Sequence, residues 1–122
     1  MPAKTSIAVL AATAIAMFAA EASADSFELI RDRSEFLSLV DGRTLKHPGV
    51  SLRVTPDGGI RGKGLGVDVT GDWRWQGDFF CRDLSWGDRD IGYNCQAVLR
   101  NGSTLRFVAD QGQGRVADFR LR

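Results

Sequence analysis

The fold is decided by residues 93–109, which read YNCQAVLRNGSTLRFVA. Two runs of mixed apolar and polar residues, 93–100 and 103–109, flank the dipeptide Asn101-Gly102. Asn and Gly both tolerate positive φ, which the type I′ turn of a two-residue hairpin requires. This stretch therefore predicts an antiparallel β-hairpin.

Similar short runs fill the chain from residue 50 onward. Apolar and polar residues alternate over 50–54, 65–70 and 115–121, as expected for strands with one buried side. Turn residues separate these runs about every 8 to 12 residues, a spacing typical of all-β domains. We predict a mainly β fold, a small antiparallel meander or barrel of about seven to eight strands. Closing the sheet would protect its two edges.

The glycine-rich segment from Gly58 to Gly77 lies within this strand region. The run Gly62-Lys63-Gly64-Leu65-Gly66 resembles a nucleotide-binding loop in composition only, because such a loop must be followed by a helix. Residues 67–70, Val-Asp-Val-Thr, predict a strand instead. We interpret these glycines as bends and bulges, and we predict no cofactor.

One short helix precedes the strands. Asp32 is a capping residue, Glu35 follows three positions later, and Gly42 supplies a stop. The pattern predicts a helix over 33–41 with Phe36 and Val40 on one face. A helix this short is unstable alone, so we expect it to plug or pack against one end of the barrel.

The first 24 residues have the three parts of a secretory signal peptide. Lys4 gives a positive start, residues 7–20 are apolar except for Thr13, and Ala22-Ser23-Ala24 is a small-x-small cleavage site. Removal of residues 1–24 leaves a single domain over 25–122. The sequence thus predicts a periplasmic or secreted monomer with no membrane span after cleavage, since no second apolar stretch is long enough to cross a bilayer.

The formal net charge of the chain is only +1. Proteins held by nucleic-acid phosphates carry a clear basic excess, so we predict no nucleic-acid partner.

Two cysteines, Cys81 and Cys95, are the only ones in the chain. Cysteines of a small exported domain usually pair in an oxidising compartment. We predict one structural disulfide, which would stabilise the fold by about 3 kcal/mol in the chain-entropy model.

Aromatic residues concentrate between residues 73 and 93. One interpretation is that these aromatic rings fill the core of a small barrel. The alternative is that some of them, with nearby arginines, contact a protein partner or a small ligand, because Trp, Tyr and Arg dominate binding energy. The candidate binding residues are Trp73, Trp75, Trp86, Tyr93, Arg74, Arg82 and Arg89. The first hypothesis is a non-enzymatic exported β-domain that uses this aromatic and arginine surface.

Catalytic and metal-binding patterns are weak in this sequence. His47 is the only histidine, and it precedes Pro48-Gly49 in a turn, so we predict no metal site and no catalytic triad. Carboxylates remain as the basis of an alternative, a carboxylate-dependent hydrolase. Its candidate residues are Asp68, Asp72, Asp83, Asp88 and Asp90.

The segments Gly71-Asp72-Trp73-Arg74-Trp75-Gln76-Gly77-Asp78-Phe79-Phe80-Cys81-Arg82 and Gly92-Tyr93-Asn94-Cys95-Gln96 carry a family resemblance. They resemble a group of short exported bacterial proteins of unassigned role that share a G-x-W-x-x-x-G-x-x-x-C…C pattern. The helical segment 36–45 looks similar as well. The shared pattern implies a common fold and assigns no catalytic residue.

Some proteins of that group are labelled dihydrodipicolinate reductase, which gives a third and most distant alternative. Such a reductase is a larger NAD(P)H enzyme with a nucleotide-binding fold and a histidine-rich catalytic segment, and none of its catalytic residues maps onto this chain. A small disulfide-linked barrel is also similar in architecture to periplasmic inhibitors of proteases or lysozymes, although architecture does not imply function.

Overall fold

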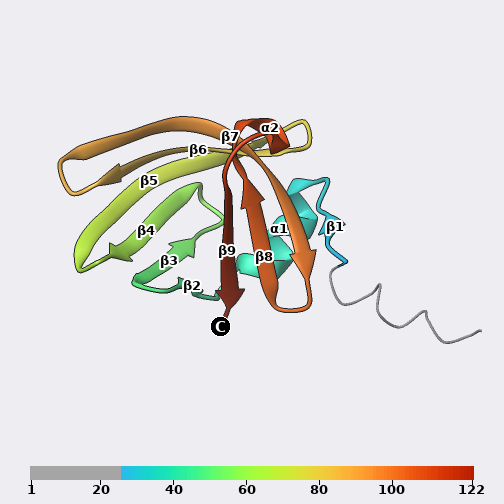
Figure 1. Cartoon of the computed structure of the whole chain (residues 1–122), viewed down its shortest axis with the longest axis horizontal. Helices are drawn as coiled ribbons and strands as arrows, with labels where there is room; N and C mark the ends of the chain where they lie inside the picture. The colour runs from blue at the N-terminus through green and yellow to red at the C-terminus, as the bar shows by residue number, and fades with distance from the viewer. Residues whose placement is uncertain (1–25) are drawn as a thin grey trace, which may run out of the picture.

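The computed structural model describes residues 26–122, which form a closed β-barrel with an added edge strand (Figure 1). The predicted signal peptide lies outside the described residues. In chain order the elements are β1 (Glu28–Leu29), α1 (Arg33–Val40), β2 (Leu45–His47), β3 (Val50–Val54), β4 (Gly59–Gly64), β5 (Val67–Gln76), β6 (Phe79–Trp86), β7 (Arg89–Asn101), β8 (Thr104–Val108), α2 (Ala109–Gly112) and β9 (Val116–Leu121).

Strands β2 to β9 form an eight-stranded antiparallel meander that closes on itself. Each strand pairs with the next along the chain, and β9 returns to pair with β2, where Leu121 lies opposite Leu45. The predicted mainly β fold, an antiparallel meander or barrel of seven to eight strands with one short N-terminal helix, is confirmed. β1 adds a short ninth strand, with Leu29 opposite Leu99 of β7.

β7 is the longest strand, and it belongs to two parts of the barrel. Its first half pairs with β6, from Arg89 to Gln96, and its second half pairs with β8, from Ala97 to Asn101. The strand changes direction between these halves, as Figure 1 shows beside α2. The Asn94 side chain links β7 to α2 at this point, because it donates to Asp110 Oδ1 at 2.8 Å and accepts from the Asp110 amide at 2.9 Å.

Helix α1 covers the barrel end where β5 turns into β6. The predicted cap is confirmed, since Asp32 accepts a hydrogen bond from the Glu35 amide at 2.9 Å. Phe36 and Val40 are completely buried, as their spacing predicted. The Phe36 ring lies 5.4 Å from the Trp73 ring and 5.0 Å from the Phe80 ring, so the helix plugs this end with an aromatic side chain.

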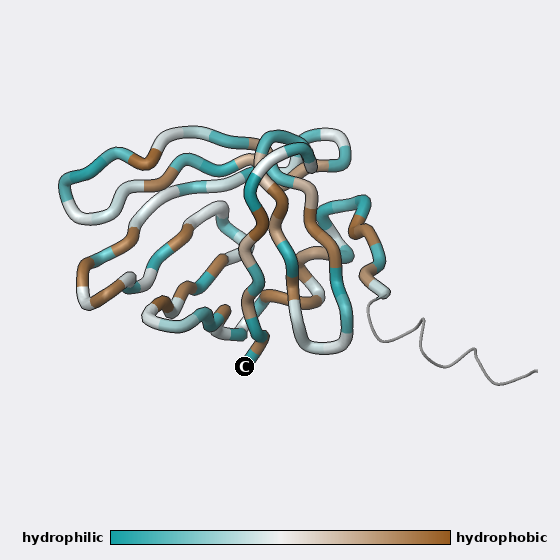
Figure 2. The backbone as a smooth tube through the Cα atoms, viewed as in Figure 1, coloured by the Kyte–Doolittle hydropathy of each residue, from teal (hydrophilic) through white to brown (hydrophobic). Residues whose placement is uncertain are grey.

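The hairpin is confirmed, but its two-residue loop is Gly102-Ser103 rather than Asn101-Gly102, because Asn101 pairs with Thr104 and of these residues only Gly102 has positive φ. The disulfide is confirmed as well, because Cys81 and Cys95 are directly opposite each other on β6 and β7 and their sulfurs are bonded. Along the strands, hydrophilic and hydrophobic residues alternate, as Figure 2 shows, which separates the inside of the barrel from its outside.

Several local predictions need correction. Leu65, expected at the start of a strand, occupies the β4–β5 turn with φ +52°, and Gly66 beside it has φ +83°. Gly71, expected to interrupt a strand, lies inside β5 because its missing side chain lets Asp83 O approach where a Cβ would stand. The loose turn expected over 110–114 is present, and it includes the end of the short segment α2, in which Asp110 and Gln111 have left-handed rather than helical backbone angles.

Candidate functional site: the barrel lumen

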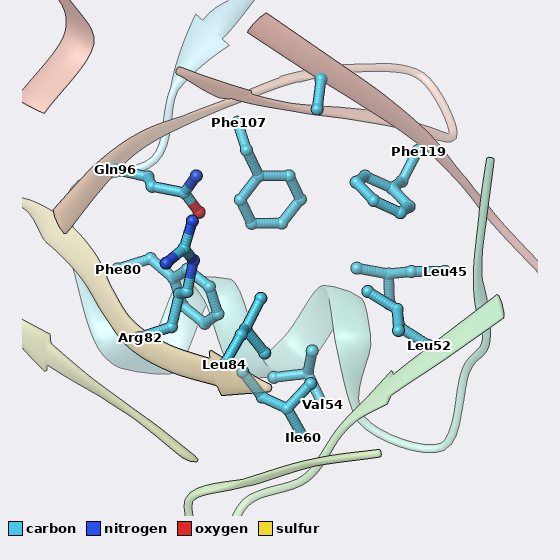
Figure 3. Close-up of a pocket in the computed structure, with 11 residues that line it drawn as sticks. Leu45, Leu52, Val54, Ile60, Phe80, Arg82, Leu84, Gln96, Phe107 and Phe119 are labelled. Atoms are coloured by element: carbon cyan, nitrogen blue, oxygen red, sulfur yellow. The ribbon is translucent and has the colours of Figure 1, made fainter. Parts of the chain in front are cut away.

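The barrel interior, called the lumen below, contains a cavity of about 190 Å³. Its walls are almost entirely apolar and come from strands distant in sequence, as Figure 3 shows. The cavity is lined by Leu45, Leu52, Val54, Ile60, Phe80, Arg82, Leu84, Gln96, Phe107, Ala117 and Phe119. An apolar cavity larger than about 150 Å³ can hold a molecule of the size of benzene.

Arg82 is the one charged side chain in this lining. It lies opposite Trp73 of β5, a buried residue, and directly opposite residues of a sheet share a face. The strand register therefore directs Arg82 into the barrel, with Phe80 and Leu84 on either side of it. Figure 3 shows its guanidinium projecting toward the lumen beside the Gln96 amide.

The positive charge of the Arg82 guanidinium is only partly balanced by other groups of the protein. Its Nη1 donates to Gly92 O at 2.8 Å, and among residues 26–122 no carboxylate forms an ion pair with it. Burial lowers the pKa of Arg82, and the carboxylate of Asp83 opposes that shift. An arginine stays protonated in proteins, so this lumen holds a positive charge beside an apolar wall.

A second apolar cavity, a groove, adjoins the lumen at the open end of the barrel. We use "open end" for the end that carries the β2–β3, β4–β5 and β6–β7 turns, opposite α1. The groove has a volume of about 250 Å³ and shares Leu52 and Leu84 with the lumen. Its remaining lining consists of Val50, Gly64, Leu65, Val69, Trp86 and Ile91. Leu52 and Leu84 therefore lie between the lumen and this groove.

Two of the predicted binding residues lie in the core at the closed end. Trp73 is 5% exposed, and its Nε1 donates to Thr55 O at 2.9 Å. Trp75 is partly buried against the core, and its Nε1 donates to Arg31 O at 3.3 Å. Both rings contact Phe36 of α1, so these tryptophans hold the helix plug in place.

Two others lie at the open end. Trp86 lines the groove, where its Nε1 donates to Gly64 O at 2.8 Å and ties β6 to β4. Arg89 begins β7 on the same hairpin and is exposed.

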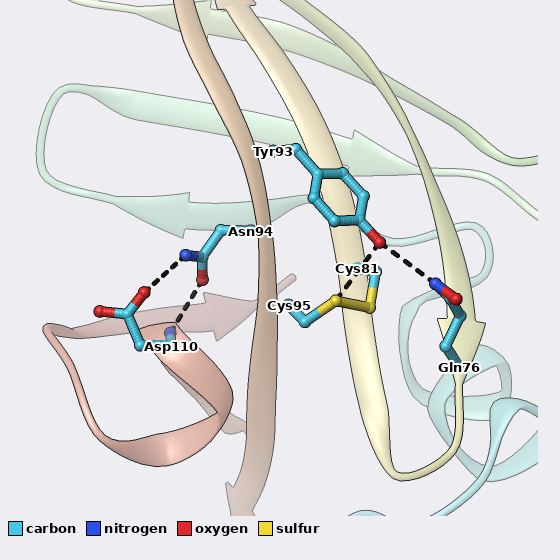
Figure 4. The surroundings of a disulfide bond; sticks show 6 residues. All are labelled: Gln76, Cys81, Tyr93, Asn94, Cys95 and Asp110. Atoms are coloured by element: carbon cyan, nitrogen blue, oxygen red, sulfur yellow. Dashed lines mark hydrogen bonds between the residues drawn. A yellow bond between two sulfur atoms is a disulfide. The ribbon is translucent and has the colours of Figure 1, made fainter.

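Tyr93 lies on the outside of the barrel beside the disulfide, as Figure 4 shows, and Arg74 is exposed directly opposite Cys81 in the sheet. Tyr93 is 53% exposed, and its hydroxyl accepts a hydrogen bond from Gln76 Nε2 at 3.1 Å. The same hydroxyl lies 3.4 Å from Cys95 Sγ. The seven predicted residues are thus spread over four places, and only Arg82 lines the lumen.

The carboxylates of the alternative hypothesis are brought together only once. Asp72 and Asp83 lie directly opposite each other on the outer face of β5 and β6, in a shallow depression with Arg74 and Tyr93. Asp68 is bound instead to Lys63 at 2.6 Å, an ion pair that lowers its pKa. Asp90 accepts from the Gly92 amide at 2.9 Å.

His47 lies at the open end, where its Nδ1 is 2.9 Å from Asp118 O. Its ring is 5.5 Å from that of Phe119 and is exposed. Within residues 26–122 no group of three or more His, Cys, Asp or Glu side chains could hold a metal ion.

The sequence analysis missed most of the lumen wall, including Leu52, Gln96 and Phe119. One signal was available, because Phe80, Arg82, Leu84 and Trp86 alternate along one strand and so share a face. A lone arginine on an otherwise apolar strand face marks a charge directed into the interior.

No helix of the described residues is long and apolar enough to cross a membrane. Comparisons with protein-family models, curated proteins and solved structures found no match to this chain.

Proposed function

We propose that this protein is a non-enzymatic binding protein whose lumen holds a small apolar molecule with one anionic group. The carrying observation is Arg82, a half-buried cation in an apolar cavity with one carbonyl contact and no carboxylate partner among the described residues. A charge removed from water is costly unless it is paired. The anionic group of a ligand would offset that cost.

The size and polarity of the cavity define the ligand class. A lumen of about 190 Å³ accepts one aromatic ring or a short aliphatic chain, and the groove accommodates a longer tail that extends toward the surface. Arg82 presents several N–H donors, which suit a planar carboxylate, and the Gln96 amide beside it offers one further contact. The ligand class is therefore a small aryl or alkyl carboxylate.

Titration calorimetry with benzoate and octanoate tests this proposal. Each carboxylate is compared with the uncharged alcohol and the amine of the same skeleton, and we expect binding of the acids only. Arg82→Met should weaken binding at least thirtyfold, since loss of a buried charge pair costs about 2 kcal/mol or more. Arg74→Met, which removes a cation from the outer face, is the matched control and should bind normally.

Two results would contradict the proposal. One is equal affinity for the acid and the alcohol. The other is unchanged binding by Arg82→Met while its thermal unfolding shows an intact fold. A complete lack of binding by every member of a series from benzoate to dodecanoate would also exclude the carboxylate class.

We further propose that the protein works outside the cytoplasm, in a periplasm or after secretion. The Cys81–Cys95 disulfide supports this location, because disulfides persist in oxidising compartments and are rare in the cytosol. Mass spectrometry of the native protein should find a mature chain that begins at Asp25. A full-length chain with two free thiols would contradict this proposal.

The hydrolase alternative rests on the pair Asp72 and Asp83. Directly opposite side chains on a sheet lie about 5 Å apart, close enough for two carboxylates to act on one bond. Both residues are exposed on the outer face, where water is not excluded from a reaction. If hydrolase activity is detected, Asp72→Asn and Asp83→Asn should each abolish it, and full activity in both variants would end this alternative.

A further inference from the structure

The charged side chains outside the barrel are separated into two regions. Strands β9, β2, β3 and β4 carry a set of exposed cations that we call the basic face: Lys46, Arg53, Arg61, Lys63 and Arg120. Strands β5 to β7 and their turns carry the exposed carboxylates Asp72, Asp78, Asp83, Asp88 and Asp90. Arg74, Arg89 and Arg100 are also exposed on β5 and β7, so the charge separation is partial, and the net charge of +1 conceals a basic excess on β9, β2, β3 and β4.

Two cation pairs of the basic face lie directly opposite each other in the sheet. Arg53 of β3 faces Arg61 of β4, and Lys46 of β2 faces Arg120 of β9. Like charges at directly opposite positions destabilise a sheet. Among the described carboxylates near this face, Asp68 pairs with Lys63 and Asp57 interacts electrostatically with Arg61, whereas Asp118 pairs with Arg106. The face therefore keeps a positive excess that folding does not require.

An exposed leucine lies at the edge of the basic face. Leu65 occupies the tip of the β4–β5 hairpin, two residues beyond Lys63, and is 76% exposed. Its φ of +52° is unfavourable for leucine, and Asn or Gly would suit this turn better. The Leu65 amide donates to Gly49 O at 2.8 Å, which fixes this tip against the β2–β3 turn beside Pro48.

We propose that the basic face docks on an anionic lipid bilayer, with Leu65 as its apolar anchor. Clustered lysine and arginine side chains bind anionic headgroups, and an apolar anchor supplies the second contribution that stable attachment requires. Charge alone would fit any polyanion, but a rigid, exposed leucine at the edge of the cationic surface favours a surface that an apolar side chain can enter. The cations of this docking surface lie outside the Arg82 lumen, and of its named residues only Leu65 also lines the neighbouring groove.

Co-sedimentation with lipid vesicles tests the proposal. We expect the mature protein to bind vesicles rich in phosphatidylglycerol and not vesicles of pure phosphatidylcholine, with binding lost at high salt. Removal of one cation should weaken binding about fivefold, so Arg53→Gln combined with Arg61→Gln should weaken it about 25-fold. The matched control is Arg74→Gln on β5, outside the basic face, which should bind normally.

Leu65→Asn separates the lipid proposal from simple charge attraction. Asparagine suits the positive φ of the turn, so this variant should keep or raise thermal stability while it loses the apolar anchor. We expect vesicle binding to fall at least threefold while retention on an immobilised anionic polysaccharide stays unchanged.

Three results would overturn the lipid assignment. The first is equal binding to neutral and anionic vesicles, and the second is full vesicle binding by the double arginine variant. The third is unaltered vesicle binding by Leu65→Asn, which would leave a soluble polyanion as the occupant of the basic face. Vesicle binding by Arg82→Met should equal that of the native protein, so failure of the lumen proposal remains distinguishable.

Discussion

The two ends of the barrel are built on different principles. At the closed end, Phe36 of α1 is completely buried and contacts a cluster of rings from β5 and β6. Toward the open end, an apolar cavity of about 190 Å³ holds the charge of Arg82, and Leu65 and Ile91 are exposed at the rim. The side chains of the closed end are tightly packed. The open end instead retains a cavity and a charged side chain, which a tightly packed core would not contain.

This difference explains why the aromatic cluster has no single role. Trp73 and Trp75 belong to the closed end and stabilise the plug, while Trp86 lines the groove of the open end. Aromatic residues that are close in sequence therefore lie in different parts of the barrel once the strands are paired. The proposed binding function therefore rests on the cavity and the charge of Arg82 rather than on the density of tryptophan in the sequence.

The largest expected effect comes from removal of the plug. Phe36→Ala should lower the free energy of unfolding by about 3–5 kcal/mol, because it opens a cavity among tightly packed rings. Phe119→Ala, at the wall of the existing cavity, should cost at least about 1 kcal/mol less, since the site is already incompletely packed. Urea unfolding measures both, and equal costs would remove the distinction between the two ends.

The disulfide should contribute the next largest effect, and it belongs to neither end. Cys81→Ser should lower the free energy of unfolding by about 2–5 kcal/mol by releasing a constraint on the unfolded chain. Tyr93→Phe, which removes only the neighbouring hydroxyl, is the control and should change stability by less than about 1 kcal/mol. Unchanged stability on reduction of the native protein would contradict this role of the bond.

A pair of matched alanines sharpens the comparison further. Ala97 is buried beneath α2, whereas Ala117 lines the lumen. Ala97→Leu should lower the free energy of unfolding by about 1–3 kcal/mol through overpacking. Ala117→Leu should raise it by about 0.5–2 kcal/mol by filling the cavity, and it should block ligand binding. Destabilisation of similar size in both variants would show that the lumen has no usable space.

The smallest effect concerns an ion pair on the outside of the barrel. Hydrogen bonds from Arg106 lower the pKa of Asp118, so the folded state favours its ionised form. The stabilisation is therefore present above the ordinary aspartate pKa of about 4 and is lost as the pH falls through the lowered value. The difference in melting temperature between the native protein and Asp118→Asn should shrink from pH 7 to pH 3. A difference that grew on acidification would contradict this assignment.

The elements that the sequence predicted well depend on local signals. The β7–β8 hairpin, the cap of α1 at Asp32 and the pairing of the only two cysteines each need few residues to specify them, although the hairpin loop lies one residue later than predicted. β4 was missed, because three of its six residues are glycine and its strand conformation follows from pairing with β3 and β5 on both sides.

The lumen could not be predicted in the same way. Leu52 and Phe119 lie 67 positions apart in the numbering and meet only after β9 pairs with β2. The alternation along β6 predicts that the Arg82 side chain points inward. Whether a carboxylate lies near it depends on which side chains of β5 and β7 also point inward, and the sequence of β6 alone does not specify these. Long-range closure, rather than local pattern, determines the candidate site.

Crystallography with a bromine-labelled ligand tests the central claim most directly. Crystals of the mature protein grown with para-bromobenzoate should show an anomalous bromine peak inside the lumen between Leu52 and Phe119, with the carboxylate at the Arg82 guanidinium. Crystals of Arg82→Met grown in the same way should show no such peak. An empty lumen in the native crystals at saturating ligand, or bromine bound only on the outer surface, would contradict the account.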